Sequence, residues 1–368
     1  MLHLTNDWWI VLWMFTGGIF MDVIVPKKEI EVCERKRIRW RLGAACLLAF
    51  PYILWAGTRG DFGDTNTYRV MLSNVPDSIG QMSAYLGEHV KDKGFTVMMI
   101  VFKSIFGNKD MLFFLFIAII QMGCVILVYR KYSVDFWTCM FLFVASTDYL
   151  SWMHNGIRQF LAATIIFGCF GWVVKKQYIP LIVVILLAST IHGSALIMIP
   201  IVFLIQGRAF QKRTLFGIFM LAVIMIYIDQ FTGLLDQLLS DTQYATTLTD
   251  EIWSQDNGTS ILRVLVYSIP TGMAFLGRRY IAYSDDPVIH ISTNAALIST
   301  ALYAISSVSS GIYFGRLPIY VSLMSYMVIP WVTRAMFLKS SERLVKACMM
   351  VGYLLFFYVQ MHFGWNIL

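Results

Sequence analysis

The chain has 368 residues, of which 58% are hydrophobic and 15% aromatic, and its mean hydropathy is +0.66. Such values exclude an ordinary soluble domain and predict an integral membrane protein in which residues 1–368 form a single domain. The formal net charge is +7. Basic residues between apolar runs orient a membrane protein, and we expect no nucleic acid partner.

Apolar runs close to the length of a membrane span recur along the chain. A spanning helix needs about 20 apolar residues, so we predict an all-α polytopic membrane protein with about 12 transmembrane helices. Two of these are the short arms of a hairpin at residues 178–206. The others are residues 8–25, 42–57, 111–129, 136–151, 157–174, 214–228, 261–277, 291–308, 312–333 and 346–362.

Lys and Arg are concentrated in every second connection between these runs. The first such connection, residues 27–41, is dominated by basic residues, and further basic clusters follow near residues 130, 175, 208–213, 278 and 334–346. Cytoplasmic loops of membrane proteins carry an excess of Lys and Arg. These connections are therefore predicted to be cytoplasmic, and residues 58–93 and 229–259 are predicted to be outer loops.

Two segments do not fit a single clean span. Residues 178–206 have basic clusters on both sides, so they must enter the membrane and return. Each arm of about 14 residues reaches about 21 Å, less than the hydrocarbon core of roughly 30 Å. We therefore expect the turn TIHGSA to place His192 in a cavity open to the outside. Residues 94–107 are interpreted as a re-entrant or interfacial helix, with a tilted span as the alternative.

Four arginines stand at or near helix ends on the predicted outer face: Arg59, Arg158, Arg263 and Arg316. Any one of them could extend to the interface or pair with an acidic loop residue. Four at one depth instead indicate an anionic ligand, because a guanidinium stays charged and binds phosphate oxygens with two hydrogen bonds. We expect this ligand to be phosphorylated and linked to a lipid.

Other polar groups are predicted on the same face. The segment 59–68 contains Asp64, Thr65 and Tyr68, which suit sugar hydroxyls or a general base, although such a segment can also be only a turn. The chain has no metal-binding or nucleotide-binding motif, so we expect no metal site and no cofactor.

Five motifs, in this order, resemble those of the EpsG family of bacterial exopolysaccharide polymerases, which are relatives of the Wzy polymerases. The resemblance covers roughly residues 55–320 and departs at Lys93, where such proteins commonly have an acidic residue before the Gly-aromatic pair. The motifs are RGDFGDTNTY at 59–68, KGF at 93–95, NGIRQFLA at 155–162, LASTIHGSAL at 187–196 and FGRLPIY at 314–320.

The resemblance implies a multi-pass protein of the bacterial plasma membrane whose active site faces outward. Such a protein joins polyprenyl-diphosphate-linked oligosaccharide repeat units, and a chain-length regulator or copolymerase is an implied partner. A sugar hydroxyl attacks an anomeric carbon, and the diphosphate leaves without a metal if arginines stabilise it. Inversion and retention at that carbon both remain open.

Specific roles follow for the polar residues. The predicted catalytic residues are His192 or Asp64 as the proton acceptor, with Arg158 and Arg316 at the diphosphate. The predicted substrate-binding residues are Arg59, Thr65, Tyr68, Asn155, Gln159, Ser194 and Arg263.

Other functions are weighed against this one. A transporter or flippase of lipid-linked oligosaccharides would also need an outer cationic cavity, but it is expected to show internal repeats or a matching cationic cavity toward the cytoplasm, and the sequence reveals neither clearly. A membrane scaffold does not explain arginines buried at the outer face. A polysaccharide ligase or an acyltransferase stays possible among enzymes.

Overall fold

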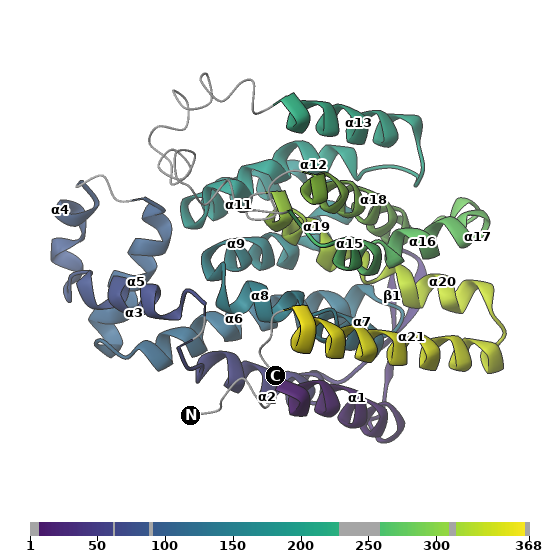
Figure 1. Ribbon diagram of the computed structural model, residues 1–368, viewed down its shortest axis with the longest axis horizontal. Coiled ribbons are helices and arrows are strands. Elements are labelled where there is room, and N and C mark those ends of the chain that lie inside the picture. The colour runs from purple at the N-terminus through teal and green to yellow at the C-terminus, as the bar shows by residue number, and fades with distance from the viewer. Residues whose placement is uncertain (1–6, 62, 88–90, 228–257, 309–313, 365–368) are drawn as a thin grey trace.

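The computed structural model describes residues 7–61, 63–87, 91–227, 258–308 and 314–364 (Figure 1). The described residues are almost all helical, which confirms the all-α prediction. Long helices lie side by side along a common direction, and α3, α4 and α5 gather at one end of them (Figure 1). All but the last two residues of the predicted outer loop 229–259 lie outside the described ranges.

The first half of the chain forms the lower and outer parts of the bundle in Figure 1. Its elements are α1 Asp7–Ile24, β1 Lys28–Val32, β2 Arg35–Arg39, α2 Leu42–Gly57, α3 Thr65–Asn74, η2 Ile79–Gln81, α4 Met82–Gly87, α5 Lys93–Phe106, α6 Asp110–Tyr132, α7 Phe136–Ala145, α8 Asp148–His154, α9 Ile157–Gly168 and α10 Phe170–Val174.

The second half completes the bundle and returns to its lower edge with the last helix (Figure 1). Its elements are α11 Tyr178–Ile191, η3 Gly193–Ile197, α12 Met198–Leu204, α13 Lys212–Tyr227, α15 Ile261–Tyr267, α16 Ile269–Leu276, α17 Arg278–Ala282, α18 Pro287–Val308, η6 Phe314–Arg316, α19 Ile319–Ser325, α20 Val328–Met336, α21 Lys339–Val359 and η7 Gln360–Gly364.

Three helices in the described ranges are long and apolar enough to cross a membrane alone: α6, α18 and the continuous segment Lys339–Gly364. The predicted number of about 12 spans is therefore not confirmed. Several expected spans are instead two shorter helices joined end to end, such as α7 with α8 and α9 with α10. The break between α7 and α8 coincides with Thr147, whose φ of 67° is incompatible with a continuous right-handed helix.

Tight packing joins the first and last helices to the middle of the chain. Trp137 in α7 donates its indole N–H to the carbonyl of Met14 in α1 at 3.0 Å. A Cβ at Gly18 would lie 1.9 Å from the Trp137 ring nitrogen, so only glycine allows this approach. Lys346 in α21 binds the Asp135 carboxylate at 2.5 Å, just before α7 begins.

Residues 27–41, expected to be a basic connection, fold into an antiparallel hairpin of β1 and β2. The two turn residues, Cys33 and Glu34, have φ values of 53° and 60°. Left-handed conformations at both central positions are typical of the tight two-residue turns that suit the twist of a hairpin. The strands therefore give the arginines of this segment fixed directions, which an irregular loop would not.

The predicted path of residues 178–206 is confirmed. α11 ends at Ile191, His192 is extended with φ −156°, and η3 and α12 return. The rings of Tyr178 and Phe203, from the two ends of the segment, lie with centroids 4.9 Å apart, as antiparallel arms require. The depth of the turn in a bilayer stays a prediction.

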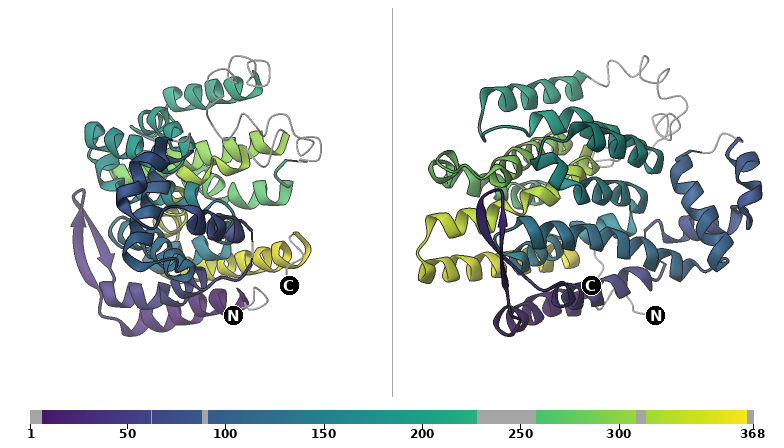
Figure 2. Two further views of the ribbon diagram at one scale, coloured as in Figure 1. Left: turned by 90° about the vertical axis from the view of Figure 1, so that its left-hand side faces the viewer. Right: turned by 180° about the vertical axis from the view of Figure 1, so that it is seen from behind.

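The helix α5, expected as a re-entrant or interfacial segment at 94–107, lies crosswise at one end of the long helices (Figures 1 and 2). This direction is the one expected of an interfacial helix rather than of a tilted span. A Cβ at Gly94 would lie 2.0 Å from the Thr190 hydroxyl oxygen, so α5 packs directly onto the end of α11. Its position relative to a membrane stays a prediction.

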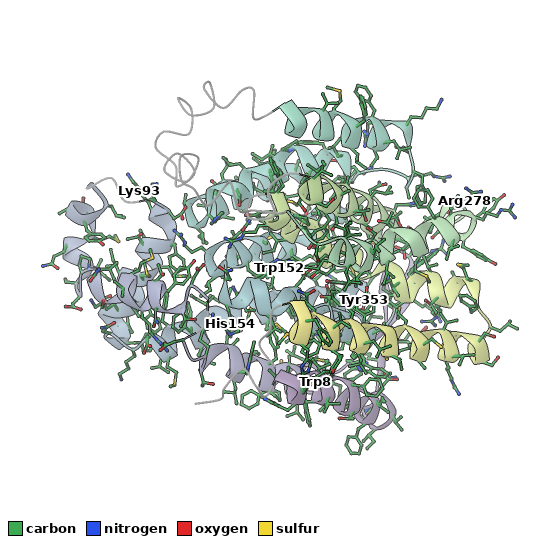
Figure 3. All side chains as sticks on the ribbon, in the orientation of Figure 1. Trp8, Lys93, Trp152, His154, Arg278 and Tyr353 are labelled. Carbon is green, nitrogen blue, oxygen red and sulfur yellow. The ribbon has the colours of Figure 1, made fainter. Side chains whose placement is uncertain are left out.

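The outer and basic segments occupy opposite ends of the molecule. Lys93 and His154 lie toward one end, and Arg278 lies at the other (Figure 3). The hairpin, α17 and the turn between α20 and α21 are on the side of Arg278 (Figure 1). This separation agrees with the charge pattern of the sequence, while the assignment of the two ends to the exterior and the cytoplasm stays a prediction.

Candidate functional site

The sequence motifs meet at the end of the bundle that carries α3 and α5. The backbone N–H of Asp64 donates to the carbonyl of His154 at 3.2 Å. Gly63 has a φ of +55°, and a Cβ there would be 3.0 Å from the same carbonyl oxygen. Phe95 packs edge-on against Tyr68, with ring centroids 5.7 Å apart. Segments far apart in the chain are thus held together by close backbone and ring contacts.

Ser194 is the centre of a hydrogen-bonded group at this end. Its hydroxyl oxygen lies 2.7 Å from Nδ1 of His192 and 2.9 Å from the hydroxyl of Tyr320. The side-chain amide of Gln159 donates to the same oxygen at 3.2 Å. The structure therefore brings together three of the predicted residues, and it adds Tyr320, whose position in the motif FGRLPIY was its only signal in the sequence.

Arg316 is joined to this group through its backbone and through Asn155. The Gln159 amide donates to the Arg316 carbonyl at 3.3 Å, and Nη2 of Arg316 donates to Oδ1 of Asn155 at 3.2 Å. Within the described ranges, Arg316 forms no ion pair with a carboxylate. In that part of the chain no described carboxylate neutralises its charge, which leaves the guanidinium suited to an anionic ligand.

Arg158 has a different environment. Its guanidinium forms an ion pair with Asp92 and donates to the hydroxyl of Tyr68 at 3.3 Å. It also lies over the Tyr68 ring, 5.7 Å from the centroid. The side chains of Arg158 and Asp92 are only 15% and 14% exposed, so the pair is largely shielded from solvent. Arg158 thus meets a ligand, if at all, with its charge already paired.

Asp92 is the functional candidate that sequence reasoning missed. Its carboxylate binds Arg158 and also accepts a hydrogen bond from the backbone N–H of Gly193, next to His192. Burial raises the pKa of Asp92, while Arg158 and the Gly193 N–H oppose that rise. Asp92 directly precedes Lys93, in DKGF, and has a left-handed φ of 50°, and α5 begins after it. That adjacency was the signal available in the sequence.

His192 is nearly buried, with 9% of its surface exposed. The charges of Arg158 and Arg316 act on its ring. A neutral imidazole has a nitrogen able to accept a proton. Asp64 is half-buried at the start of α3, and its charge acts on Arg158. Both residues stay candidates for the proton acceptor.

Arg59 and Thr65 are buried in the protein. The Arg59 side chain donates to the carbonyls of Ala56, at 2.6 Å, and of Met153, and its guanidinium lies 4.7 Å from the centre of the Phe114 ring. Thr65 is fully buried. Their contacts and burial are those of residues that stabilise the fold. Ligand binding by Arg59 or Thr65 stays a prediction.

Arg263 belongs to a separate polar cluster inside the bundle. Its Nη2 lies 3.9 Å from Oδ1 of Asp148, and its Nε donates to the hydroxyl of Tyr267 at 3.5 Å. The hydroxyls of Tyr303 and Tyr326 donate to Oδ2 of Asp148 at 3.2 and 3.4 Å. Asp148 was not singled out in the sequence, where it occurs in an apolar run at the start of α8. We call these five residues the Asp148 cluster.

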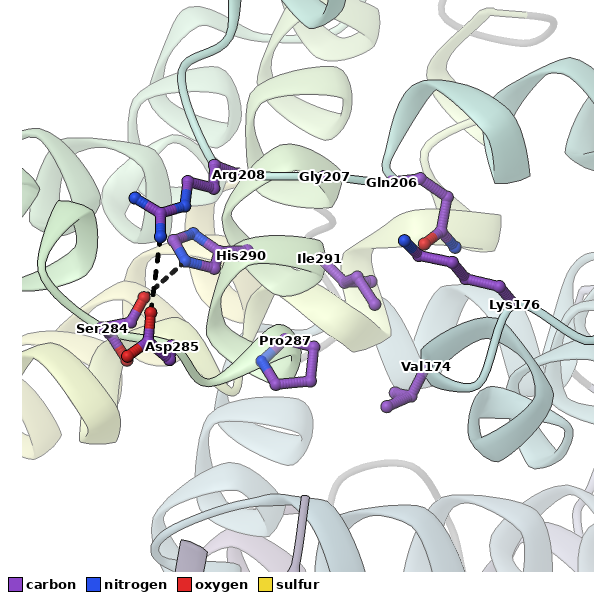
Figure 4. A pocket seen from close by; sticks show the side chains of 10 residues that line it. All are labelled: Val174, Lys176, Gln206, Gly207, Arg208, Ser284, Asp285, Pro287, His290 and Ile291. Carbon is purple, nitrogen blue, oxygen red and sulfur yellow. Dashed lines mark hydrogen bonds and ion pairs between the residues drawn. The ribbon is translucent and has the colours of Figure 1, made fainter. Parts of the chain in front are cut away.

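A cavity of about 280 Å³ lies at the opposite end of the molecule, between the connection after α12 and the start of α18 (Figure 4). Its histidine, His290, accepts a hydrogen bond from the Ala209 N–H at 3.0 Å and lies 2.8 Å from the Ser284 carbonyl. Arg208 pairs with Asp285 at 3.4 Å. Since both ring nitrogens of His290 bind the main chain, this histidine has a structural role rather than a catalytic one.

Within the part of the chain that the structure describes, no group of three or more His, Cys, Asp or Glu side chains could hold a metal ion.

Residues 44–365 match the model of the EpsG family. No curated protein matches the chain, and no solved structure matches it. The match extends past the last of the five motifs and covers nearly the whole chain.

Proposed function

This chain belongs to the EpsG family, and on that premise we propose that it is a membrane glycosyltransferase that polymerises polysaccharide repeat units. The substrates are polyprenyl-diphosphate-linked oligosaccharides, and the reaction takes place at the end of the bundle that carries α3, α5 and the turn 192–195. We place that end at the outer face of a bacterial plasma membrane, as the charge pattern predicts.

The observation that carries this proposal is the environment of Arg316. Among the described residues, the side-chain partner of the partly buried Arg316 is the amide of Asn155. A partly buried guanidinium without a carboxylate is costly unless an anion binds it. Next to it, the hydroxyls of Ser194 and Tyr320, 2.9 Å apart, offer the donors and acceptors that a sugar requires. A diphosphate attached to a sugar satisfies both needs in one ligand.

The chemistry is a displacement at an anomeric carbon. A hydroxyl oxygen of one lipid-linked unit forms a bond to the anomeric carbon of another, and the bond from that carbon to the diphosphate oxygen breaks. The electron pair leaves with the diphosphate, where Arg316 stabilises the charge. The hydroxyl proton passes to His192 or Asp64. Asp92 holds Arg158 and the Gly193 N–H, and it thereby sets the position of the His192 turn.

A transporter of the same lipid-linked substrates is the second candidate, because a basic cavity is present at the opposite end of the molecule, between the hairpin and α20. Alternating access needs a path between the two ends. Along α9 and α10, which run between them, the apolar side chains from Phe160 to Val173 are mostly buried. This packing favours the polymerase.

Purified protein incubated with a lipid-diphosphate oligosaccharide tests the proposal. We expect a ladder of longer lipid-linked glycans and release of polyprenyl diphosphate, and we expect Arg316→Lys to lower both by about 100-fold. The same protein in sealed vesicles measures movement of substrate across the bilayer. Movement without a ladder would identify a transporter, and transfer to an unrelated acceptor would identify a ligase.

A further inference from the structure

The hairpin directs a row of arginines toward the bundle. Successive side chains of a strand point to opposite faces, and in β2 the buried residue is Arg37, while Lys36 and Ile38 are exposed. Arg35 and Arg39 share the face of Arg37. The sequence RKRIR therefore places three guanidiniums on the side that meets the bundle.

Two of these arginines, Arg35 and Arg37, line part of a cavity with an excess of positive charge. The cavity has a volume of about 280 Å³ and lies between the hairpin, the connection before α18 and α20. Four cationic side chains and one carboxylate line it: Arg35, Lys36, Arg37, Arg334 and Asp286. Asp286 is bound to Arg37 at 2.5 Å, and their side chains are 5% and 2% exposed. The carboxylate that lines the cavity is therefore already bound, by Arg37 through Oδ2 and by the Val288 N–H through Oδ1.

The other cations of the cavity have only weak partners. Arg35 is 3.9 Å from Asp285, and Lys36 is 3.4 Å from Glu29, in pairs that are open to solvent. Ion pairs that are exposed to solvent contribute little stabilisation. Arg334 forms no ion pair with the described residues. The cavity thus carries positive charge that the described residues balance only weakly.

A buried donor adds a second, independent observation. Nε of Arg37 is buried and has no hydrogen-bond partner among the described residues, although the same side chain binds Asp286 through Nη2. Leaving a buried charged donor unmatched is costly. The oxygen atoms of an anion in the cavity would accept hydrogen bonds from these guanidinium N–H groups.

We propose that this cavity binds a phosphate group. The chemistry fits the phosphodiester of an anionic lipid headgroup and also inorganic phosphate. Trp331, half-buried on the cavity wall, is a residue typical of membrane interfaces, and basic clusters at the cytoplasmic surface bind anionic headgroups. These features favour a lipid. The site lies at the end opposite the glycosyl-transfer site and does not depend on that activity.

The test measures the thermal stability of the purified, full-length protein in detergent. Phosphatidylglycerol, phosphatidylcholine and inorganic phosphate are added separately at constant ionic strength. We expect phosphatidylglycerol to raise Tm by about 3 °C, as a ligand well above its Kd should. The double variant Arg35→Gln/Arg334→Gln should lose this shift. Both side chains lie outside the buried Arg37–Asp286 pair, so the fold should persist.

Arg278→Gln is the matched control, because Arg278 is an exposed arginine at the same end of the molecule and does not line the cavity (Figure 3). It should keep the full shift. A shift with inorganic phosphate alone would identify free phosphate as the ligand. Equal shifts with phosphatidylglycerol and phosphatidylcholine, or equal losses in the double variant and the control, would each overturn the proposal.

Discussion

Two polar clusters lie within the helical bundle, and they differ in how each neutralises its arginine. In the Asp148 cluster, Arg263 faces a carboxylate that two tyrosine hydroxyls also bind. At the candidate site, the described side chain that binds Arg316 is the neutral amide of Asn155. Polar burial alone therefore does not mark a ligand site in a membrane protein. A charge that the protein leaves unbalanced is the more specific signal.

Removing the arginine of the Asp148 cluster should have the largest effect, and the effect should be on the fold. Arg263→Gln leaves Asp148 buried without a cation and should cost about 3 kcal/mol of stability. The measurement is protein level and Tm. Asp148→Asn added to Arg263→Gln should recover most of the loss, since both charges are then absent. A stable single variant with no polymer would instead assign Arg263 to the reaction.

Arg316→Lys should change the reaction and not the fold. The ammonium keeps the charge but loses the planar, two-donor geometry, so polymer yield should fall by about 100-fold, which is typical for the loss of a donor to a developing negative charge. Protein level and Tm should match the wild type. Arg278→Lys, at the opposite end, serves as the control. Near wild-type yield from Arg316→Lys would remove the distinction between the two clusters.

Asp92→Asn tests the role of the carboxylate that pairs with Arg158, for which Arg316 has no described counterpart. The amide cannot balance Arg158, and it binds the Gly193 N–H more weakly, so the His192 turn loses its anchor. We expect polymer yield to fall by about tenfold, a typical effect of a group that orients a catalytic residue. Asp61→Asn is the control, because Asp61 also pairs with an arginine, Arg69, but is 66% exposed. Equal effects of the two variants would contradict a positioning role.

The sequence by itself determined the helical membrane character, the in-and-back path of residues 178–206 and the family. Composition and local hydrophobicity carry the first two of these, and the ordered motifs carry the third. The number of membrane-spanning helices could not be determined from the sequence. Breaks such as the one at Thr147, with its φ of 67°, divide apolar runs that look continuous when only hydrophobicity is counted.

The tertiary structure alone decided which polar residues act together. Ser194 meets Tyr320, Asp92 meets Arg158, and Arg263 meets Asp148, all across long stretches of chain. A sequence shows which arginines lie near helix ends, but not which of them has a carboxylate within reach. That depends on how the helices pack, because a few ångströms separate a paired charge from one that is left for a ligand.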